Sequence, residues 1–348
     1  MAKIRVLIVD DSAVVRNILS EALSRDPEIE VVGTAADPFI AREKIIQLKP
    51  DVITLDVEMP RMDGITFLKK LMAAKPMPVV MVSALTQAGA DTTLAALDAG
   101  AVEIVAKPQI DQRVGVREIE MEVVDKVKAA SKANMNLYAR QIRSTPGKVA
   151  VAKAHTAMIK TTDKIIAIGS STGGTEALKE VLMRLPTDTP GILIVQHMPE
   201  GFTKAFADRL NSICPMQIQE AQNGDSLITG RALIAPGNSH MMLRRSGAKY
   251  YIDVKDGPLV MRHRPSVEVL FQSVAKYGGA NAIGVMLTGM GNDGSTGMLE
   301  MKKSGSFNIA QDEASCVVFG MPKEAIKLGG VDKVVSLDDI PQAILNAV

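Results

Sequence analysis

The chain has 348 residues, which is more than one ordinary hydrophobic core needs and predicts two domains. Hydrophobic residues make up 47% and charged residues 23%, as in soluble globular proteins, and 40 basic against 39 acidic residues leave no overall field to attract nucleic acid or an anionic membrane. The two cysteines lack a CxxC spacing, so the sequence argues against a disulfide scaffold and a zinc site and favours the cytoplasm. No apolar run reaches the roughly 18 residues of a membrane span, which argues against membrane insertion.

Short apolar runs separated by helix-length segments recur in the first third of the chain. This alternation predicts parallel strands with helices on both faces of the sheet. We expect a flavodoxin-like, doubly wound α/β domain of βα units over residues 1–125. Helical spacing places Ile40, Ile45 and Leu48 on one stripe of its second helix. The expected strands are Ile4–Val9, Ile29–Gly33, Val52–Leu55, Val79–Val82 and Val102–Ala106.

A basic segment follows this domain. A further helical pattern runs from Gly115 to about Gln141, and residues 126–162, which contain eight Lys or Arg and no Asp or Glu, form the expected linker with a helical start. Charge runs are usually solvated, so a solvated connection is favoured over a dedicated docking segment, which remains an alternative.

Apolar runs resume after the linker and predict a second, larger doubly wound α/β domain with a mostly parallel sheet over residues 163–348. One predicted helix places Phe202, Phe206, Leu210 and Ile213 on its apolar stripe. The turn-rich stretch 216–254 is typical of a hairpin. The expected strands are Ile165–Ile168, Ile192–Val195, Ala232–Ala235, Ile283–Leu287 and Val331–Val335.

The strands of the first domain end on side chains suited to phosphoryl chemistry. Asp10, Asp11, Asp56, Ser83 and Lys107 all fall at the carboxyl edge of the predicted sheet, where ligands of such sheets collect. A lone Asp there is more often a helix cap or a turn residue, but the combined pattern argues against that reading. Three clustered carboxylates favour Mg²⁺, and Asp56, the most central, is the expected acceptor of a phosphoryl group. Ser83 and Lys107 would contact the added phosphoryl oxygens.

These motifs resemble the receiver domain of bacterial response regulators over residues 3 to about 125. The matching segments are Val9–Ser12, Leu55–Pro60, Asp63–Gly64, Ser83–Ala84 and Lys107–Pro108. The resemblance implies a histidine kinase as phosphodonor and a cis peptide bond between Lys107 and Pro108.

The second domain contains a G-x-S-x-G motif at Gly169–Gly173, between a predicted strand and a predicted helix. This context is typical of a nucleophile elbow, in which a sharp turn exposes the serine, here Ser171. Glycine-rich turns of this kind also bind phosphate. However, Thr175 and Glu176 occupy the positions where a P-loop needs Lys and Ser or Thr, and Ser171 replaces the second glycine of a dinucleotide fingerprint. A hydrolase is therefore favoured.

A serine nucleophile needs a base and an orienting acid. Of the four histidines, His197 directly follows a predicted strand, whereas His155 lies in the linker and His240 and His263 follow turn or basic segments. A lone histidine is more often structural, but His197 shares an edge with Ser171. Asp293, in a glycine-rich loop after another strand, is the candidate acid; an exposed turn Asp is the simpler alternative.

The second domain also resembles a known family, the chemotaxis protein-glutamate methylesterases or CheB family. The matching segments are Ser171–Gly174, Gln196–Pro199, Ala235–Gly237, Arg264–Ser266 and Gly289–Gly294. The resemblance implies removal of methyl groups from glutamate methyl esters of methyl-accepting chemoreceptors, deamidation of receptor glutamines, and activation by phosphorylation of the receiver.

The resemblance also implies roles for individual residues. Ser171 would be the nucleophile, His197 the base and Asp293 its orienting acid, with no cofactor for the esterase reaction. The backbone amides near Thr172 and Met290 are candidates for the oxyanion hole.

Two other function classes are weighed against this one. A transcription factor is a common output for a receiver. However, the long α/β pattern, the lack of a helix-turn-helix pattern and the near-neutral charge argue against nucleic acid as a ligand. A non-catalytic adaptor that docks on receptors is the second alternative, and an assay for released methanol separates it from an esterase.

Overall fold

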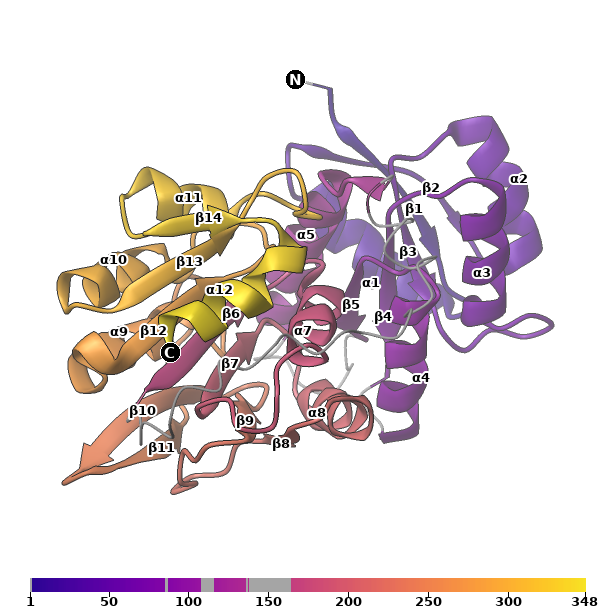
Figure 1. Ribbon diagram of the computed structural model, residues 1–348. Helices are drawn as coiled ribbons and strands as arrows, with labels where there is room; N and C mark the ends of the chain where they lie inside the picture. The colour runs from indigo at the N-terminus through magenta and orange to yellow at the C-terminus, as the bar shows by residue number, and fades with distance from the viewer. Residues whose placement is uncertain (1, 85–86, 108–115, 136, 138–163) are drawn as a thin grey trace. The chain divides into compact units, whose positions relative to one another are not determined.

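The computed structural model describes residues 2–84, 87–107, 116–135, 137 and 164–348, in two compact units (Figure 1). The units are Met1–Thr145 and Pro146–Val348, so the division falls inside the predicted linker, most of which lies outside the described residues. Among the helices that are described, none is long and apolar enough to cross a membrane.

The first unit contains a parallel sheet in the order β2-β1-β3-β4-β5. This is the strand order of flavodoxin-like, doubly wound domains, and every residue of β3 and β4 is buried, as expected for strands covered on both faces. The strands are β1 Ile4–Val9, β2 Ile29–Ala35, β3 Val52–Asp56, β4 Val79–Ser83 and β5 Glu103–Ala106.

Five described helices flank this sheet, and α1 packs against α5. Ser12, Asp37 and Asp63 cap the first three at their N-termini by accepting backbone hydrogen bonds. Of the stripe expected in α2, Ile45 is buried but Ile40 is exposed, because the helix turns Pro38 and Ala41 inward together with Ile45. The helices are α1 Ala13–Ser24, α2 Pro38–Leu48, α3 Gly64–Ala74, α4 Gln87–Asp98 and α5 Val116–Ser131.

The second unit contains a seven-stranded sheet in the order β14-β13-β12-β6-β7-β9-β8, and all of its recorded pairings are parallel. The strand order reverses around β6: the chain runs from β6 to β7 on one side and later returns to β12 on the other. Ligands of such sheets bind at this switch point. The strands are β6 Ile165–Ser170, β7 Ile192–Gln196, β8 Gln217–Glu220, β9 Arg231–Ile234, β12 Ala282–Met286, β13 Phe307–Gln311 and β14 Lys333–Val335.

The strands β8 and β13 were not expected from the sequence. In β8 only Ile218 is buried, because this strand forms an edge of the sheet, and β13 begins with an exposed Phe307 followed by the polar Asn308. The hairpin expected in 216–254 is present as β10 His240–Ser246 and β11 Lys249–Lys255, and it turns at Gly247, where φ is 59°.

Helices cover both faces of this second sheet, with α9 beside α10 and α7 beside α12 (Figure 1). The helix α8 buries Phe202, Phe206 and Leu210 as expected, whereas Ile213, at its last position, is exposed. The helices are α7 Gly174–Leu182, α8 Phe202–Ile213, α9 Val267–Tyr277, α10 Ser295–Lys303, α11 Met321–Lys327 and α12 Ile340–Ala347, with short 3₁₀ turns at Gly279–Asn281 and Leu337–Asp339.

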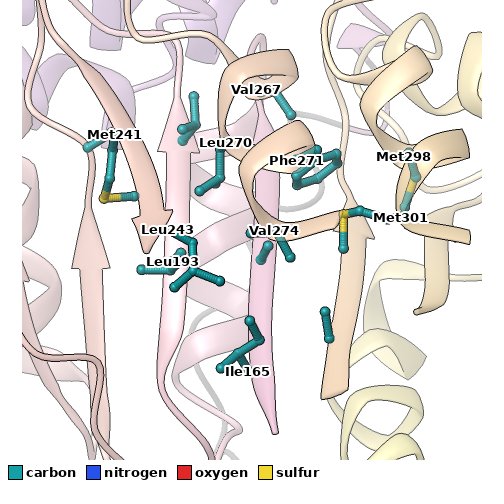
Figure 2. Close-up of a cluster of buried hydrophobic side chains, with 14 of the residues drawn as sticks. Ile165, Leu193, Met241, Leu243, Val267, Leu270, Phe271, Val274, Met298 and Met301 are labelled. Atoms are coloured by element: carbon teal, nitrogen blue, oxygen red, sulfur yellow. The ribbon is translucent and has the colours of Figure 1, made fainter. Parts of the chain in front are cut away.

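Helix α9 is the centre of the core of the second unit. Figure 2 shows Val267, Leu270, Phe271 and Val274 on its inner face, between β10 and α10 and over the strands of the sheet. All four side chains are fully buried, and burial of each contributes about 1.5–3 kcal/mol. This packing fixes the position of the first turn of α9, which lies at the switch point of the sheet.

Candidate functional sites

The acidic side chains predicted from the sequence gather at the carboxyl edge of the first sheet. Asp10 directly follows β1 and Asp56 ends β3, and these two strands are neighbours. One carboxylate oxygen from each of Asp10, Asp11 and Asp56 lies within 4.8 Å of the others. Asp10 and Asp56 are buried whereas Asp11 is exposed, so a cation could reach the cluster from the solvent side.

The charges in this cluster are only partly compensated by the protein itself. Lys107 Nζ lies 2.7 Å from Asp56 Oδ2 and 3.4 Å from Asp10 Oδ2. These two buried oxygens accept no hydrogen bond of good geometry within the described residues. Burial raises the pKa of Asp56 to about 6, against the effect of the Lys107 ammonium, and the neighbouring charge of Asp10 also raises it. Three carboxylates, two of which have unsatisfied buried oxygens, fit a hard divalent cation such as Mg²⁺.

Ser83 and Lys107 lie at the ends of β4 and β5, and the Lys107 amide donates to the Ser83 carbonyl (2.7 Å). The Ser83 hydroxyl accepts a hydrogen bond from Thr93 Oγ1 of α4 (2.7 Å), a partner that the sequence did not indicate. A movement of Ser83 towards a phosphoryl oxygen would therefore break a contact with α4. The expected cis bond before Pro108 lies outside the described residues.

We expect Mg²⁺ to raise the thermal midpoint of the first unit at pH 7.5 and to lose this effect as the pH falls through about 6. Because the pKa of Asp56 in the folded state is raised above the ordinary 3.8, its buried charge destabilises the metal-free protein above pH 6. That cost disappears as the pH falls and the carboxyl takes up a proton, and the proton then competes with the metal. Scanning calorimetry with and without Mg²⁺, at pH 7.5 and at a pH below 6, measures the effect.

Two variants make this measurement specific. Asp56→Asn should show no Mg²⁺-dependent shift at either pH. Asp63→Asn, which removes the carboxylate that caps α3 outside the cluster, should retain it. A shift that persists in Asp56→Asn would place the metal elsewhere.

The three residues predicted for hydrolysis follow three neighbouring strands of the second sheet. Ser171 comes directly after β6, His197 after β7, and Asp293 lies in the loop after β12. The ends of β6 and β7 are in register, with Ser170 opposite Gln196. The Ser171 amide donates to the Thr288 carbonyl (3.0 Å), which ties β6 to the loop that carries Asp293. The structure therefore brings Ser171, His197 and Asp293 to one edge.

Gln196 distinguishes the two adjacent serines of the motif. Ser170 is fully buried and its hydroxyl donates to Gln196 Oε1 (2.8 Å), so Ser170 is a structural residue. Gln196 Nε2 in turn donates to the carbonyls of Ser171 (3.0 Å) and His197 (3.3 Å). A Cβ at Gly289 would lie 2.9 Å from Ser171 Cβ, so only glycine fits there without displacing the serine. Ser171 is thus held on its backbone by contacts that leave its hydroxyl for chemistry.

His197 and Asp293 form a buried pair. His197 Nε2 donates to Asp293 Oδ2 at 2.7 Å, and both side chains are almost inaccessible to solvent. Asp293 also accepts hydrogen bonds from Ser266 Oγ (2.7 Å), Val267 N (2.7 Å) and Glu268 N (3.0 Å) at the N-terminus of α9. Burial opposes its charge, but the His197 contact and these donors lower the pKa of Asp293 below its ordinary value. Asp293 therefore remains ionised near neutral pH.

The two residues proposed for the oxyanion hole lie beside Ser171 and in the Asp293 loop. Thr172 is buried and Met290 partly buried. Within the described residues, neither of their amides donates to a backbone carbonyl outside the helices and strands.

The other histidines have different positions. His240 Nε2 contacts the Pro258 carbonyl (2.9 Å), and His155 lies outside the described residues. His263 stacks on the ring of His197. Gln196 and Ser266 stood in sequence motifs, but their roles were missed. The signal available for Gln196 was a polar residue ending an otherwise apolar strand; nothing local in the sequence linked Ser266 to Asp293.

Comparison with known proteins agrees with this arrangement. The family model for the CheB methylesterase matches residues 166–344, and that for the response regulator receiver domain matches residues 6–117. A protein of Syntrophus aciditrophicus is named protein-glutamate methylesterase/protein-glutamine glutaminase 2. It is 58% identical over 348 residues, and the alignment covers 100% of each chain. A relative of Geobacter metallireducens, with the same name and the number 3, is 56% identical, with 99% of each chain covered.

A solved structure supports the fold of the second unit. The CheB methylesterase catalytic domain of Thermotoga maritima is 39% identical, superposes with a TM-score of 0.52, and matches 53% of this chain and 98% of its own. This match argues against the DNA-binding alternative. With its sequence matched from end to end, this chain belongs to the CheB methylesterase family and joins a receiver domain to a methylesterase catalytic domain.

Proposed function

We propose that this protein is a phosphorylation-activated serine hydrolase that removes methyl groups from glutamate methyl esters of methyl-accepting chemoreceptors. The observation that carries the proposal is the buried 2.7 Å contact between His197 and Asp293, next to a serine at the neighbouring strand end. The names of the relatives support the substrate class.

The geometry suggests how Ser171 would be activated. Because Nε2 of His197 faces Asp293, Nδ1 is the nitrogen that would accept the proton of the Ser171 hydroxyl. The serine Oγ forms a bond to the ester carbonyl carbon, and the negative charge of Asp293 stabilises the imidazolium. Collapse of the tetrahedral intermediate breaks the bond to the methoxy oxygen, which takes the proton from His197 and leaves as methanol.

Water completes the reaction. His197 removes a proton from a water molecule that attacks the acyl-serine, and the proton passes to Ser171 Oγ as glutamate is released. With a glutamine side chain the same steps release ammonia, which is the proposed glutaminase activity. These steps require only groups of the protein and water, so we propose no cofactor for them.

The oxyanion needs hydrogen-bond donors, and we propose the backbone amides of Thr172 and Met290 for this role. Their support is position: Thr172 follows the nucleophile, and Gly289, the neighbour of Met290, contacts Ser171. Loss of one such donor typically costs about 100- to 1,000-fold in rate.

The receiver would supply the control. We propose Asp56 as the acceptor of a phosphoryl group from a histidine kinase, with Asp10 and Asp11 completing a Mg²⁺ site. The cation would neutralise charge between phosphodonor and carboxylate. Lys107 already contacts Asp56 and would pair with the added charge, while Ser83 would exchange its Thr93 contact for a phosphoryl oxygen.

Methanol release from methylated receptor membranes tests this function. We expect release by the full-length protein, and faster release when a small-molecule phosphodonor and Mg²⁺ are added. Asp56→Asn should not be labelled by the phosphodonor and should not respond to it.

The possible outcomes separate the parts of the proposal. No methanol under any condition would favour a non-catalytic adaptor. Methanol release that is indifferent to the phosphodonor would contradict the control by Asp56 but not the esterase. Labelling of Asp56→Asn would assign the phosphoryl group to another residue.

A further inference from the structure

His263 lies flat against the ring of the proposed base. The centroids of the His197 and His263 rings are 3.7 Å apart, and their planes differ by 20°. Asp293 contacts one edge of the His197 ring, so His263 supplies a contact of a different kind, on a face. We propose that His263 is a positioning residue that keeps the His197 ring in the orientation needed to take the proton of Ser171. This inference rests on the proposed function of the triad.

A tight turn presents His263 to its neighbour. Val260 and His263 exchange two backbone hydrogen bonds, of 3.1 and 2.9 Å, which close a two-residue hairpin turn. The two central residues, Met261 and Arg262, have φ values of 50° and 69°. This left-handed conformation suits glycine and costs free energy for other residues. Such conformations persist where the surrounding structure imposes them, and they concentrate at functional sites.

The chain that follows the turn is fixed as well. The Arg264 side chain donates from Nε to Asn238 Oδ1 (2.8 Å) and from another nitrogen to the Gly257 carbonyl. Two residues later Ser266 donates to Asp293. The segment 260–268 therefore contacts both members of the His–Asp pair: its first part stacks on His197, and its last part binds Asp293.

The chemistry explains why a face contact matters. The contact with Asp293 fixes Nε2 at the edge of the ring, and a contact at one edge does not by itself prevent the ring from tilting about it. His197 must accept and return a proton in each half of the reaction, and proton transfer needs a short, well-aligned approach. A flat neighbour at van der Waals distance restricts this tilt in both protonation states. Misplacement of a reacting group by about 1 Å costs on the order of 100-fold in rate.

The test compares variants of the full-length protein in the methanol-release assay, with kcat and KM measured separately. His263→Ala should lower kcat about 10- to 100-fold with KM little changed. His263→Phe, which restores a flat ring, should recover most of the loss. Met261→Gly should retain the wild-type kcat, because glycine accepts the turn conformation and Met261 is an exposed residue outside the core.

Several results would overturn the proposal. A wild-type kcat in His263→Ala would do so. A rise in KM with kcat unchanged would also do so, because it would make His263 a substrate contact. If His263→Ala does not fold, His263→Leu fills the space without a flat face, and equal kcat values for the Leu and Phe variants would reject stacking. His197→Ala, measured in parallel, should be inactive; activity in that variant would refute the triad itself, whatever the His263 variants show.

Discussion

Replacing Ser171 with alanine is expected to abolish methanol release, whereas replacing Ser170 with alanine is expected to leave a substantial part of it. Loss of a catalytic serine in a triad costs roughly a million-fold in kcat. Ser171 stands at the edge shared with His197 and Asp293, whereas the Ser170 hydroxyl is buried against Gln196. A single-turnover assay should place the residual rate about a million-fold below that of the wild type.

Ser170→Ala is the matched control because it changes the neighbouring residue of the same motif. It removes one hydrogen bond to Gln196 and leaves the Gln196 contact with the Ser171 carbonyl. We expect a lower thermal midpoint, from a loss of about 1–3 kcal/mol, with activity retained. Equal inactivation of the two variants, or an active Ser171→Ala, would contradict the assignment of Ser171 as the nucleophile.

Asp293→Asn is expected to lower kcat about 10,000-fold while the protein stays folded. The carboxylate accepts hydrogen bonds from His197 and from the first turn of α9, and it stabilises the imidazolium that forms during the reaction. An asparagine keeps the shape but brings no charge, and its amide can hold the wrong tautomer of His197. Methanol release with pre-steady-state sampling measures the loss.

Asp312→Asn provides the comparison for Asp293. Asp312 also follows a strand of the second sheet, β13, and it accepts hydrogen bonds from Ser315, but it does not contact His197. We expect activity within a few-fold of the wild type. If both variants lose activity to the same extent, the effect of Asp293 would be one of folding, and Asp293 would not be the orienting acid.

Much of the arrangement could be anticipated because it follows from strand ends. An apolar run that stops at Asp56 or just before Ser171 places that residue at the carboxyl edge of a parallel sheet, and neighbouring strands then bring such residues together. The strand order of the first unit and the register of β6 with β7 agree with this reasoning.

Contacts made by other elements could not be anticipated in this way. The donors to Asp293 come from the start of α9, and the stacking of His263 depends on a left-handed turn at two non-glycine residues. Neither leaves a periodic pattern in the sequence. Strand β8 was missed for a related reason, since an edge strand buries little and Ile218 alone gives no alternation. Ile40 and Ile213 show the opposite case, in which an apolar residue at helical spacing faces solvent.

Helix α9 links the chemistry of this domain to its folding. Its apolar face is packed into the core, and its first turn supplies the hydrogen bonds that keep Asp293 charged. A molecule in which this helix has loosened would lose the hydrogen bonds that orient its acid together with its core. Such a partly folded molecule would be inert rather than an indiscriminate esterase. Because one helix serves both the core and the acid, hydrolysis is confined to fully folded protein.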